Sequence, residues 1–208
     1  MAMAQPQPNF HFDLSGGNLA LDFANTVSYR PTENRKERLA EYRNLVAFGK
    51  ETGALPARAI DRLYAKAGQA PKEGQRALQN AISLREGLFE IFSAVAEARP
   101  IPSDALALLN AALQESASHG RIVHTSRRFA WEWIGMDGYF GSVLWPVARA
   151  GAELLTSEEV ANLRICASDK CAWLFLDKTK NHRRRWCDMK TCGNRVKAQR
   201  HYQRIKAS

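Results

Sequence analysis

Four cysteines near the end of the chain constrain its fold more than any other feature of the sequence. They are Cys166, Cys171, Cys187 and Cys192, spaced as C-x4-C-x15-C-x4-C, and no other cysteine occurs among the 208 residues. Two close pairs separated by a medium loop can place four thiolates around one tetrahedral ion. Zn²⁺ suits four sulfur ligands best, and such a site leaves no position open for catalysis. We therefore expect one structural zinc ion held by these cysteines.

Three alternatives to zinc are two disulfides, an iron–sulfur cluster and four unrelated buried cysteines, and the last is disfavoured because no other cysteine occurs in the chain. Two disulfides would suit an exported protein. The first residues, 1–8, have Gln and Pro where a signal peptide would have its apolar core, so we expect a cytoplasmic protein with reduced thiols. An iron–sulfur cluster is the second alternative. No apolar run approaches the ~18 residues of a membrane span, so no membrane partner is expected.

The positive charge of the chain is concentrated in the same segment. The formal net charge is +9. Residues 161–208 contain 13 Lys and Arg against 3 Asp and Glu, whereas residues 1–160 contain 17 against 18. Such a segment is either a solubilising surface or a nucleic-acid-binding module. We expect a module that binds double-stranded DNA, and the alternative is a finger that binds RNA or another protein.

The last part of the chain, about 188–206, is expected to be a helix that begins at the second cysteine pair. Lys197, Arg200 and Arg204 share one face of it, which is therefore open to an anion. With a cysteine knuckle and a hairpin before it, this helix would complete a treble-clef-like zinc finger. The nearly opposite face, which we expect to be docked on protein, carries Ala198, Tyr202 and Ile205.

Further residues of the finger are candidates for contacts with DNA. Asn194, Arg195 and Arg200 suit base reading, because Asn pairs with adenine and Arg with guanine in the major groove. The alternative for Asn194 and Arg195 is structural, namely hydrogen bonds that tie the helix start to the zinc thiolates. The aromatic residues Trp173, Phe175 and Trp186 are expected in the core of the finger rather than as base-stacking platforms. Phosphate contacts are expected from a run of loop residues, Arg183, Arg184 and Arg185.

The sequence around the cysteines closely resembles the CGNR zinc-finger family. The family is named for four residues that here are Cys192, Gly193, Asn194 and Arg195, and the resemblance covers nearly all of 160–206. The stretch Leu19-Ala-Leu-Asp-Phe-Ala-Asn-Thr26 is similar to the N-terminal domain that accompanies this finger. The resemblance implies a stress-linked bacterial transcription regulator whose finger binds DNA.

The chain as a whole is expected to be mostly α with short β-hairpins, an α+β fold. We expect a disordered N-terminus over 1–9, a larger helical domain over 10–160 and the basic finger over 161–208. Within the helical domain the patterns predict a strand at 10–14 and a helix from Asn18, for which a strand is the competing prediction. Helices are expected at 37–51, 72–98 and 138–155 and after Pro56 and Ser103, and a hairpin at 121–125 and 128–134.

The first 160 residues contain no recognisable catalytic motif, so we expect a protein that is not an enzyme. An enzyme with a non-obvious site in this domain is the alternative. The domain is expected to sense a small-molecule ligand or to form a homodimer, to which the alternating Trp131 and Trp133 could contribute. Four polar residues in apolar surroundings are candidates for ligand binding, with helix capping or structural linking as the alternative: Asp22, Asn25, Thr26 and Arg85.

Overall fold

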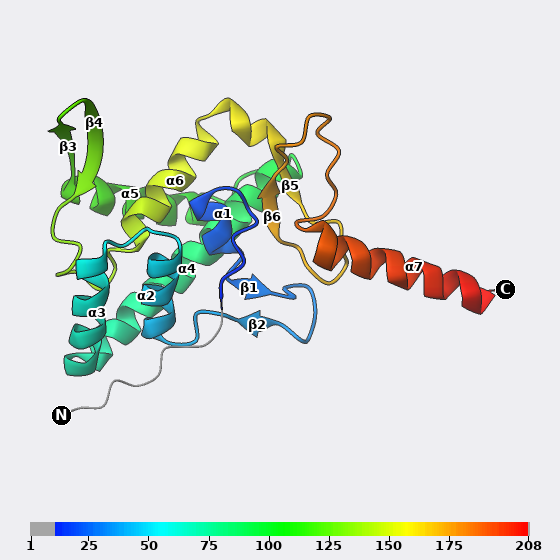
Figure 1. Cartoon of the computed structure of the whole chain (residues 1–208), viewed down its shortest axis with the longest axis horizontal. Helices are drawn as coiled ribbons and strands as arrows, with labels where there is room; N and C mark the ends of the chain where they lie inside the picture. The colour runs from blue at the N-terminus through cyan, green and yellow to red at the C-terminus, as the bar shows by residue number, and fades with distance from the viewer. Residues whose placement is uncertain (1–10, 208) are drawn as a thin grey trace.

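The computed structural model describes residues 11–207 of the chain, so the segment 1–9, expected to be disordered, lies outside the described residues. Within this range the chain is mostly helical with short two-stranded hairpins, which confirms the expected fold class (Figure 1). Among residues 11–207 no helix combines the length and apolar character needed to cross a membrane.

In the described part of the chain, the body of the molecule consists of a short central helix, α1 (Leu19–Ala24), and five longer helices around it. All its residues from Ala20 to Ala24 are buried, and α1 packs against α4 and α6. Asn18 caps the helix, because its side-chain oxygen accepts a hydrogen bond of 2.8 Å from the Ala20 N–H. The segment is therefore a helix and not the competing strand. The other five are α2 (Tyr42–Glu51), α3 (Ala57–Gln69), α4 (Pro71–Ala96), α5 (Ser103–His119) and α6 (Leu144–Leu155).

The longest helix, α4, runs through the core of this body. Pro71 occupies its first position, where a missing N–H does no harm. Its buried residues recur at helical spacing, and α4 contacts α1, α2, α3 and α5. The expected helix at 72–98 is confirmed, with its end two residues earlier than expected.

The strands pair only as antiparallel hairpins in the part of the chain described. β1 (Val27–Ser28) pairs with β2 (Lys36–Glu37), and β3 (Gly120–Thr125) pairs with β4 (Arg128–Trp133), as the aromatic and β-branched pattern predicted. The third hairpin joins β5 (Leu163–Ile165) to β6 (Leu174–Leu176), with Leu163 opposite Leu176.

The β5–β6 hairpin shares the hydrophobic core of the helical body. Leu163, Leu174 and Leu176 are almost completely buried and belong to the same cluster as the core residues of α1 and α4. Burying a leucine side chain contributes about 1.5–3 kcal/mol, so these three residues hold the hairpin firmly to the body. The β5–β6 hairpin, on which the first two cysteines lie, is thus part of the main core.

Three expectations about elements were wrong in detail. Residues 11–14 form no strand, because Phe12 packs its ring against Phe48 and donates its backbone N–H to Glu51 instead of to another strand. The helix expected from 37 begins at Tyr42, because Lys36 and Glu37 pair with β1. The helix expected over 138–155 begins at Leu144, after a series of turns.

Candidate metal centre and basic surface

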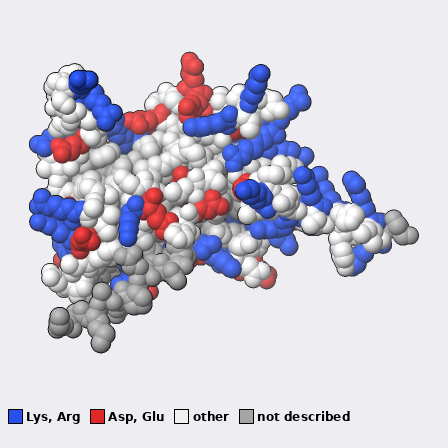
Figure 2. All heavy atoms as spheres, in the orientation of Figure 1, with Lys and Arg blue, Asp and Glu red and all other residues white. Residues whose placement is uncertain are grey.

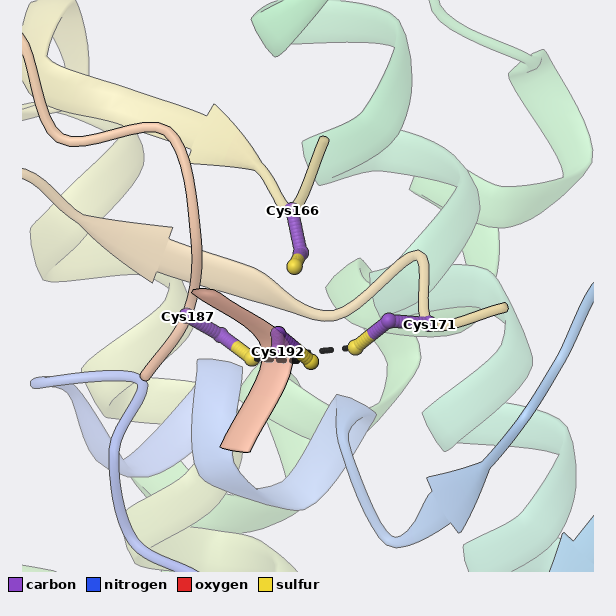
Figure 3. Close-up of side chains that lie close together, drawn as sticks. All are labelled: Cys166, Cys171, Cys187 and Cys192. Carbon is purple, nitrogen blue, oxygen red and sulfur yellow. Dashed lines mark hydrogen bonds between the residues drawn. The ribbon is translucent and has the colours of Figure 1, made fainter. Parts of the chain in front are cut away.

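The four cysteines come together in the structure from four separate points of the chain. Cys166 directly follows β5, Cys171 precedes β6, Cys187 ends a long loop, and Cys192 lies in a π-helical turn, Met189–Gly193. Their sulfur atoms all lie within 4.8 Å of one another and point toward a common centre (Figure 3). The Cys187 sulfur is 3.6 Å from that of Cys171 and also 3.6 Å from that of Cys192.

This geometry fits a tetrahedral zinc ion. With Zn–S bonds of ~2.3 Å, the sulfur atoms of a tetrahedral site lie about 3.8 Å apart. All four cysteines are buried and none forms a disulfide. Four thiolates would fill the coordination sphere, so the site can organise the chain but cannot offer an open position to a substrate.

Backbone hydrogen bonds hold the ligand loops in place. The N–H of Cys166 donates to the carbonyl of Trp173 at 2.8 Å, which closes the first knuckle. Asp188 caps the turn that carries Cys192 by accepting the Thr191 N–H at 2.7 Å. Hydrogen bonds from the Thr191 backbone and side chain lower the pKa of Asp188, so the cap stays ionised. A β-carbon at Gly193 would lie 2.4 Å from the Met189 sulfur, so a larger residue there would require this flexible, half-exposed side chain to move.

The loop before Cys187 is folded around one buried carboxylate. Asp177 accepts hydrogen bonds from the N–H of Thr179 at 3.0 Å and from the N–H of Arg184 at 2.8 Å. Although burial opposes ionisation, these bonds and the Thr179 hydroxyl hold the pKa of Asp177 below its usual value. The carboxylate therefore fixes the path of the loop.

The three adjacent arginines of this loop have different environments. Arg184 lies 4.5 Å above the ring of Phe175 and donates to the backbone carbonyls of Trp186 and Cys187. Its guanidinium therefore stabilises the loop and the metal-ligand backbone. Arg183 and Arg185 are exposed, so only these two present their charge outward.

The C-terminal helix α7 (Asn194–Ala207) extends away from the rest of the molecule (Figure 1). Lys197, Arg200 and Arg204 are exposed on it, and Figure 2 shows several Lys and Arg side chains among uncharged residues on the finger and α7. The expectation that the face with Ala198, Tyr202 and Ile205 is docked on protein was wrong. Ala198 is exposed, and Tyr202 and Ile205 are each 61% exposed, because only the first turn of α7 meets the body.

The two residues after Gly193 differ in environment. Asn194 is exposed at the start of α7. Arg195 is half-buried, with its guanidinium 5.3 Å from the centre of the Tyr29 ring and 3.4 Å from the Tyr29 hydroxyl. Arg195 thus ties the helix start to the β1 segment rather than extending into solvent. Of the aromatic residues expected in the core of the finger, Phe175 is fully buried, and Trp173 and Trp186 pack against the cysteine cluster.

The finger is docked on the body through the segment that follows α1. The Asn25 amide makes two hydrogen bonds to the backbone of Leu174, and the Trp173 indole N–H donates to the Val27 carbonyl at 2.8 Å. Sequence reasoning missed Tyr29 and Val27 as partners of the finger, because nothing local marks a contact between residues about 146–166 positions apart.

Three of the four candidate ligand residues lie near one another, and the fourth does not. Asp22, Asn25 and Thr26 border a hollow of ≈ 40 Å³. Burial raises the pKa of Asp22 to about 6, although a hydrogen bond from the Gly16 N–H opposes this. The hydroxyl of Thr26 donates to the Phe23 carbonyl at 2.8 Å. These hydrogen bonds show that all three side chains have structural roles.

The fourth candidate, Arg85, belongs to a separate ion-pair network. It is fully buried on α4 and lies 2.6 Å from Glu37 and 2.7 Å from Glu86. Arg30 joins the same cluster at 2.5 Å from Glu86. Although burial opposes ionisation, these arginines hold the pKa values of Glu37 and Glu86 below their usual range. The network fastens β2 to α4.

Comparison with known families covers almost the whole described chain. Residues 17–158 match a family described as "Putative stress-induced transcription regulator", and residues 162–205 match the CGNR zinc finger. Neither of these is a family of enzymes. No curated protein matches the chain. The cysteine cluster lies within the second match, so these four residues hold one structural zinc ion. The chain belongs to the "Putative stress-induced transcription regulator" family and carries a CGNR zinc finger after the family domain.

Proposed function

We propose that this protein is a DNA-binding transcription regulator whose zinc finger presents α7 to the double helix. The observation that carries the proposal is the exposed basic face of α7, with Lys197, Arg200 and Arg204, on a helix held at one end only. A free helix of this length is marginally stable in water, so a partner along its face is expected. Its 14 residues span about 21 Å, and a major groove about 12 Å wide admits a helix.

The candidate contacts divide by their environment. Arg183, Arg185, Lys197 and Arg204 are suited to phosphate contacts, which position a protein on DNA without reading sequence. Asn194 and Arg200 are exposed on α7 and are the candidates for base reading. The remaining two candidates are better explained as structural, since Arg184 binds backbone carbonyls and Arg195 contacts Tyr29.

We assign a regulatory role to the helical body, and this role is either the sensing of a ligand or homodimerisation. The hairpin β3–β4 supports the second of these, because Phe129 is 74% and Ile122 60% exposed on the same face of this hairpin. Exposed apolar patches of this kind commonly mark protein interfaces. Sedimentation experiments test this assignment. It is supported if the wild-type chain is a homodimer and the double substitution Ile122→Ser and Phe129→Ser dissociates it. A wild-type chain that is monomeric at all concentrations would contradict it. Such a regulator, with reduced thiols, would work in the cytoplasm.

The DNA-binding proposal is tested by fluorescence anisotropy with a labelled random-sequence duplex at about 0.1 M salt, near physiological ionic strength. The wild-type chain is expected to bind, with affinity that falls steeply as salt rises. The triple substitution of Lys197, Arg200 and Arg204 to Gln is expected to abolish binding. A matched control removes the same charge from exposed positions of the body, as Lys72→Gln, Arg76→Gln and Arg127→Gln, and should bind normally.

Two outcomes would overturn the proposal. One is the absence of duplex binding by zinc-loaded protein at low salt. The other is tighter binding to single-stranded RNA of the same length, which would favour an RNA-binding finger instead.

A further inference from the structure

Three of the four zinc-binding cysteines border an open cleft between the finger and the β1–β2 hairpin. The cleft has a volume of ≈ 200 Å³, and its lining includes Cys171, Cys187 and Cys192 but not Cys166. This is smaller than the pockets of about 300–1,000 Å³ that hold drug-sized ligands. All four cysteines are nearly buried, so a small reagent can approach the cluster through this cleft, whereas a protein reagent cannot.

The walls of this cleft carry a mixture of charges that favours small anionic reagents. Lys170 and Arg195 line it together with Arg38, and Asp13 is the carboxylate in the lining. Lys170 is exposed and stands at the rim next to Cys171. Cations beside a cleft raise the local concentration of anions. The thiolate form of cysteine, which zinc binding enforces, is also the nucleophilic form.

The spacing of the sulfur atoms gives Cys187 two close neighbours with which it can form a disulfide. Its sulfur lies 3.6 Å from Cys171 and 3.6 Å from Cys192. A disulfide bond is about 2.0 Å long, so a shift of less than 2 Å would join either pair.

We infer that the cysteine cluster is also a redox-modification site, at which a small peroxide or hypohalite converts Cys187 and one of its two neighbours into a disulfide. A thiolate first attacks the oxidant: a peroxide loses its O–O bond, its leaving group departs as hydroxide or another oxyanion, and a sulfenic acid forms, whereas hypochlorous acid loses its O–Cl bond, hydroxide leaves and a sulfenyl chloride forms. The neighbouring thiolate then attacks that sulfur, forms the S–S bond and displaces hydroxide or chloride. The two sulfurs lose two electrons in total, and the oxidant gains them. The two thiolates that remain cannot hold the zinc ion, which is released.

Because of the fold, the loss of structure that follows this oxidation is limited to the end of the chain. The β5–β6 hairpin is held without zinc by Leu163, Leu174 and Leu176 in the main core and by Asn25. The loop from Lys178 is held by Asp177 and by the contact of Arg184 with Phe175 rather than by the main core, and α7 mainly meets the turn that carries Cys192. Oxidation therefore releases residues 178–206 and leaves the body folded. Loss of DNA binding would follow only if the proposed function is correct, whereas the oxidation itself does not depend on it.

The test uses zinc-loaded full-length protein treated with an equimolar amount of hydrogen peroxide or hypochlorite. Zinc release is followed with a chromogenic chelator, the disulfide is mapped by mass spectrometry, and amide hydrogen exchange is measured along the chain. We expect zinc release together with a disulfide that contains Cys187, a free thiol at Cys166, and faster exchange in 178–206 but not in 163–165 or 174–176. A thiol reductant with added zinc should restore the starting state.

A charge variant tests the role of the cleft. Lys170→Glu is expected to slow zinc release by the anionic peroxide peroxymonosulfate several-fold, and to leave release by uncharged hydrogen peroxide unchanged. Lys178→Glu makes the same change of charge on an exposed residue outside the cleft lining and should leave both rates unchanged. Retention of zinc after oxidation, equal participation of Cys166 in the first disulfide, or faster exchange throughout the body would each overturn the inference.

Discussion

Asn25 pairs both polar atoms of its side-chain amide with the backbone of Leu174. Its Nδ2 donates to the Leu174 carbonyl at 2.8 Å, and its Oδ1 accepts from the Leu174 N–H at 2.9 Å. The amide takes the place that a neighbouring strand would occupy beside β6. A residue at the end of α1 thus holds the metal-binding segment to the helical body.

Replacing Asn25 with alanine is expected to destabilise the whole chain. The change leaves a buried N–H and a buried carbonyl of Leu174 unpaired, and each such group costs about 1–3 kcal/mol. We expect the free energy of unfolding in urea to fall by about 3 kcal/mol, with zinc content unchanged in native buffer. Asn34→Ala, at an exposed position, is the control. A loss below about 0.5 kcal/mol, the range of ordinary surface substitutions, would contradict the docking role.

Arg183 and Arg184 are adjacent, but we expect their substitutions to affect different properties of the protein. Arg184→Ala removes the contact with Phe175 and the hydrogen bonds to the carbonyls of Trp186 and Cys187, so it should lower zinc affinity and stability by about 1–3 kcal/mol. Arg183→Ala should leave stability within about 0.5 kcal/mol and weaken duplex binding. Chelator competition and fluorescence anisotropy measure the two effects. If both substitutions changed zinc affinity and duplex binding equally, the structural role of Arg184 and the DNA-contact role of Arg183 would not be distinct.

Removal of zinc by a chelator is expected to expose the end of the chain to protease while the body stays folded. Residues 178–206 contain many Lys and Arg, and their positions depend on Cys187 and Cys192. Limited trypsin digestion of the zinc-free protein should therefore cut first within 178–206 and leave a resistant fragment that ends near Leu176. Zinc-loaded protein should resist these cuts except at the exposed end of α7. Simultaneous cutting within α4 would show that the body also needs the ion.

The contribution of Asp22 to the stability of the protein is expected to decrease as the pH rises through the range of this carboxyl group. Burial raises the pKa of this carboxyl from 3.8 to about 6. Between these values the folded state binds more protons than the unfolded state, so stability is greatest below pH 4 for this group and is lost as the pH rises to about 6. The shift corresponds to about 3 kcal/mol at most.

The substitution Asp22→Asn isolates this contribution. The amide oxygen can still accept the Gly16 N–H, but it carries no buried charge. We expect the variant to be about 2 kcal/mol more stable than wild type at pH 7 and to lose the slope between pH 4 and 6. Asp61→Asn, at an exposed position, should keep the wild-type profile. An unchanged slope in the Asp22 variant would rule out Asp22 as its source.

The features that follow from local spacing were predictable from the sequence. The intervals between the cysteines predicted the metal site, the periodicity of α4 predicted the longest helix, and alternation predicted β3–β4. Each of these patterns depends on neighbours within a few turns of chain.

The features that depend on distant partners were not predictable in this way. The apolar residues Tyr202 and Ile205 suggested a docked face, but only the tertiary arrangement shows that α7 extends away from the body. The run of three arginines gave no sign that Arg184 turns inward onto Phe175. Nothing in the sequence pairs Tyr29 with Arg195, and the cleft beside the cysteines exists only because these segments meet.

The burial of β5–β6 in the main core has a consequence for protein engineering. A cassette cut at residue 161 and transplanted to another scaffold would carry Leu163, Leu174 and Leu176 uncovered, and would be prone to aggregate. The unit that could be exchanged between members of the family is shorter, from residue 178 to the end of α7. A chimera joined there would keep its own knuckle and hairpin while importing a foreign α7, so any binding specificity that the proposed function places on this helix could be exchanged without rebuilding the scaffold.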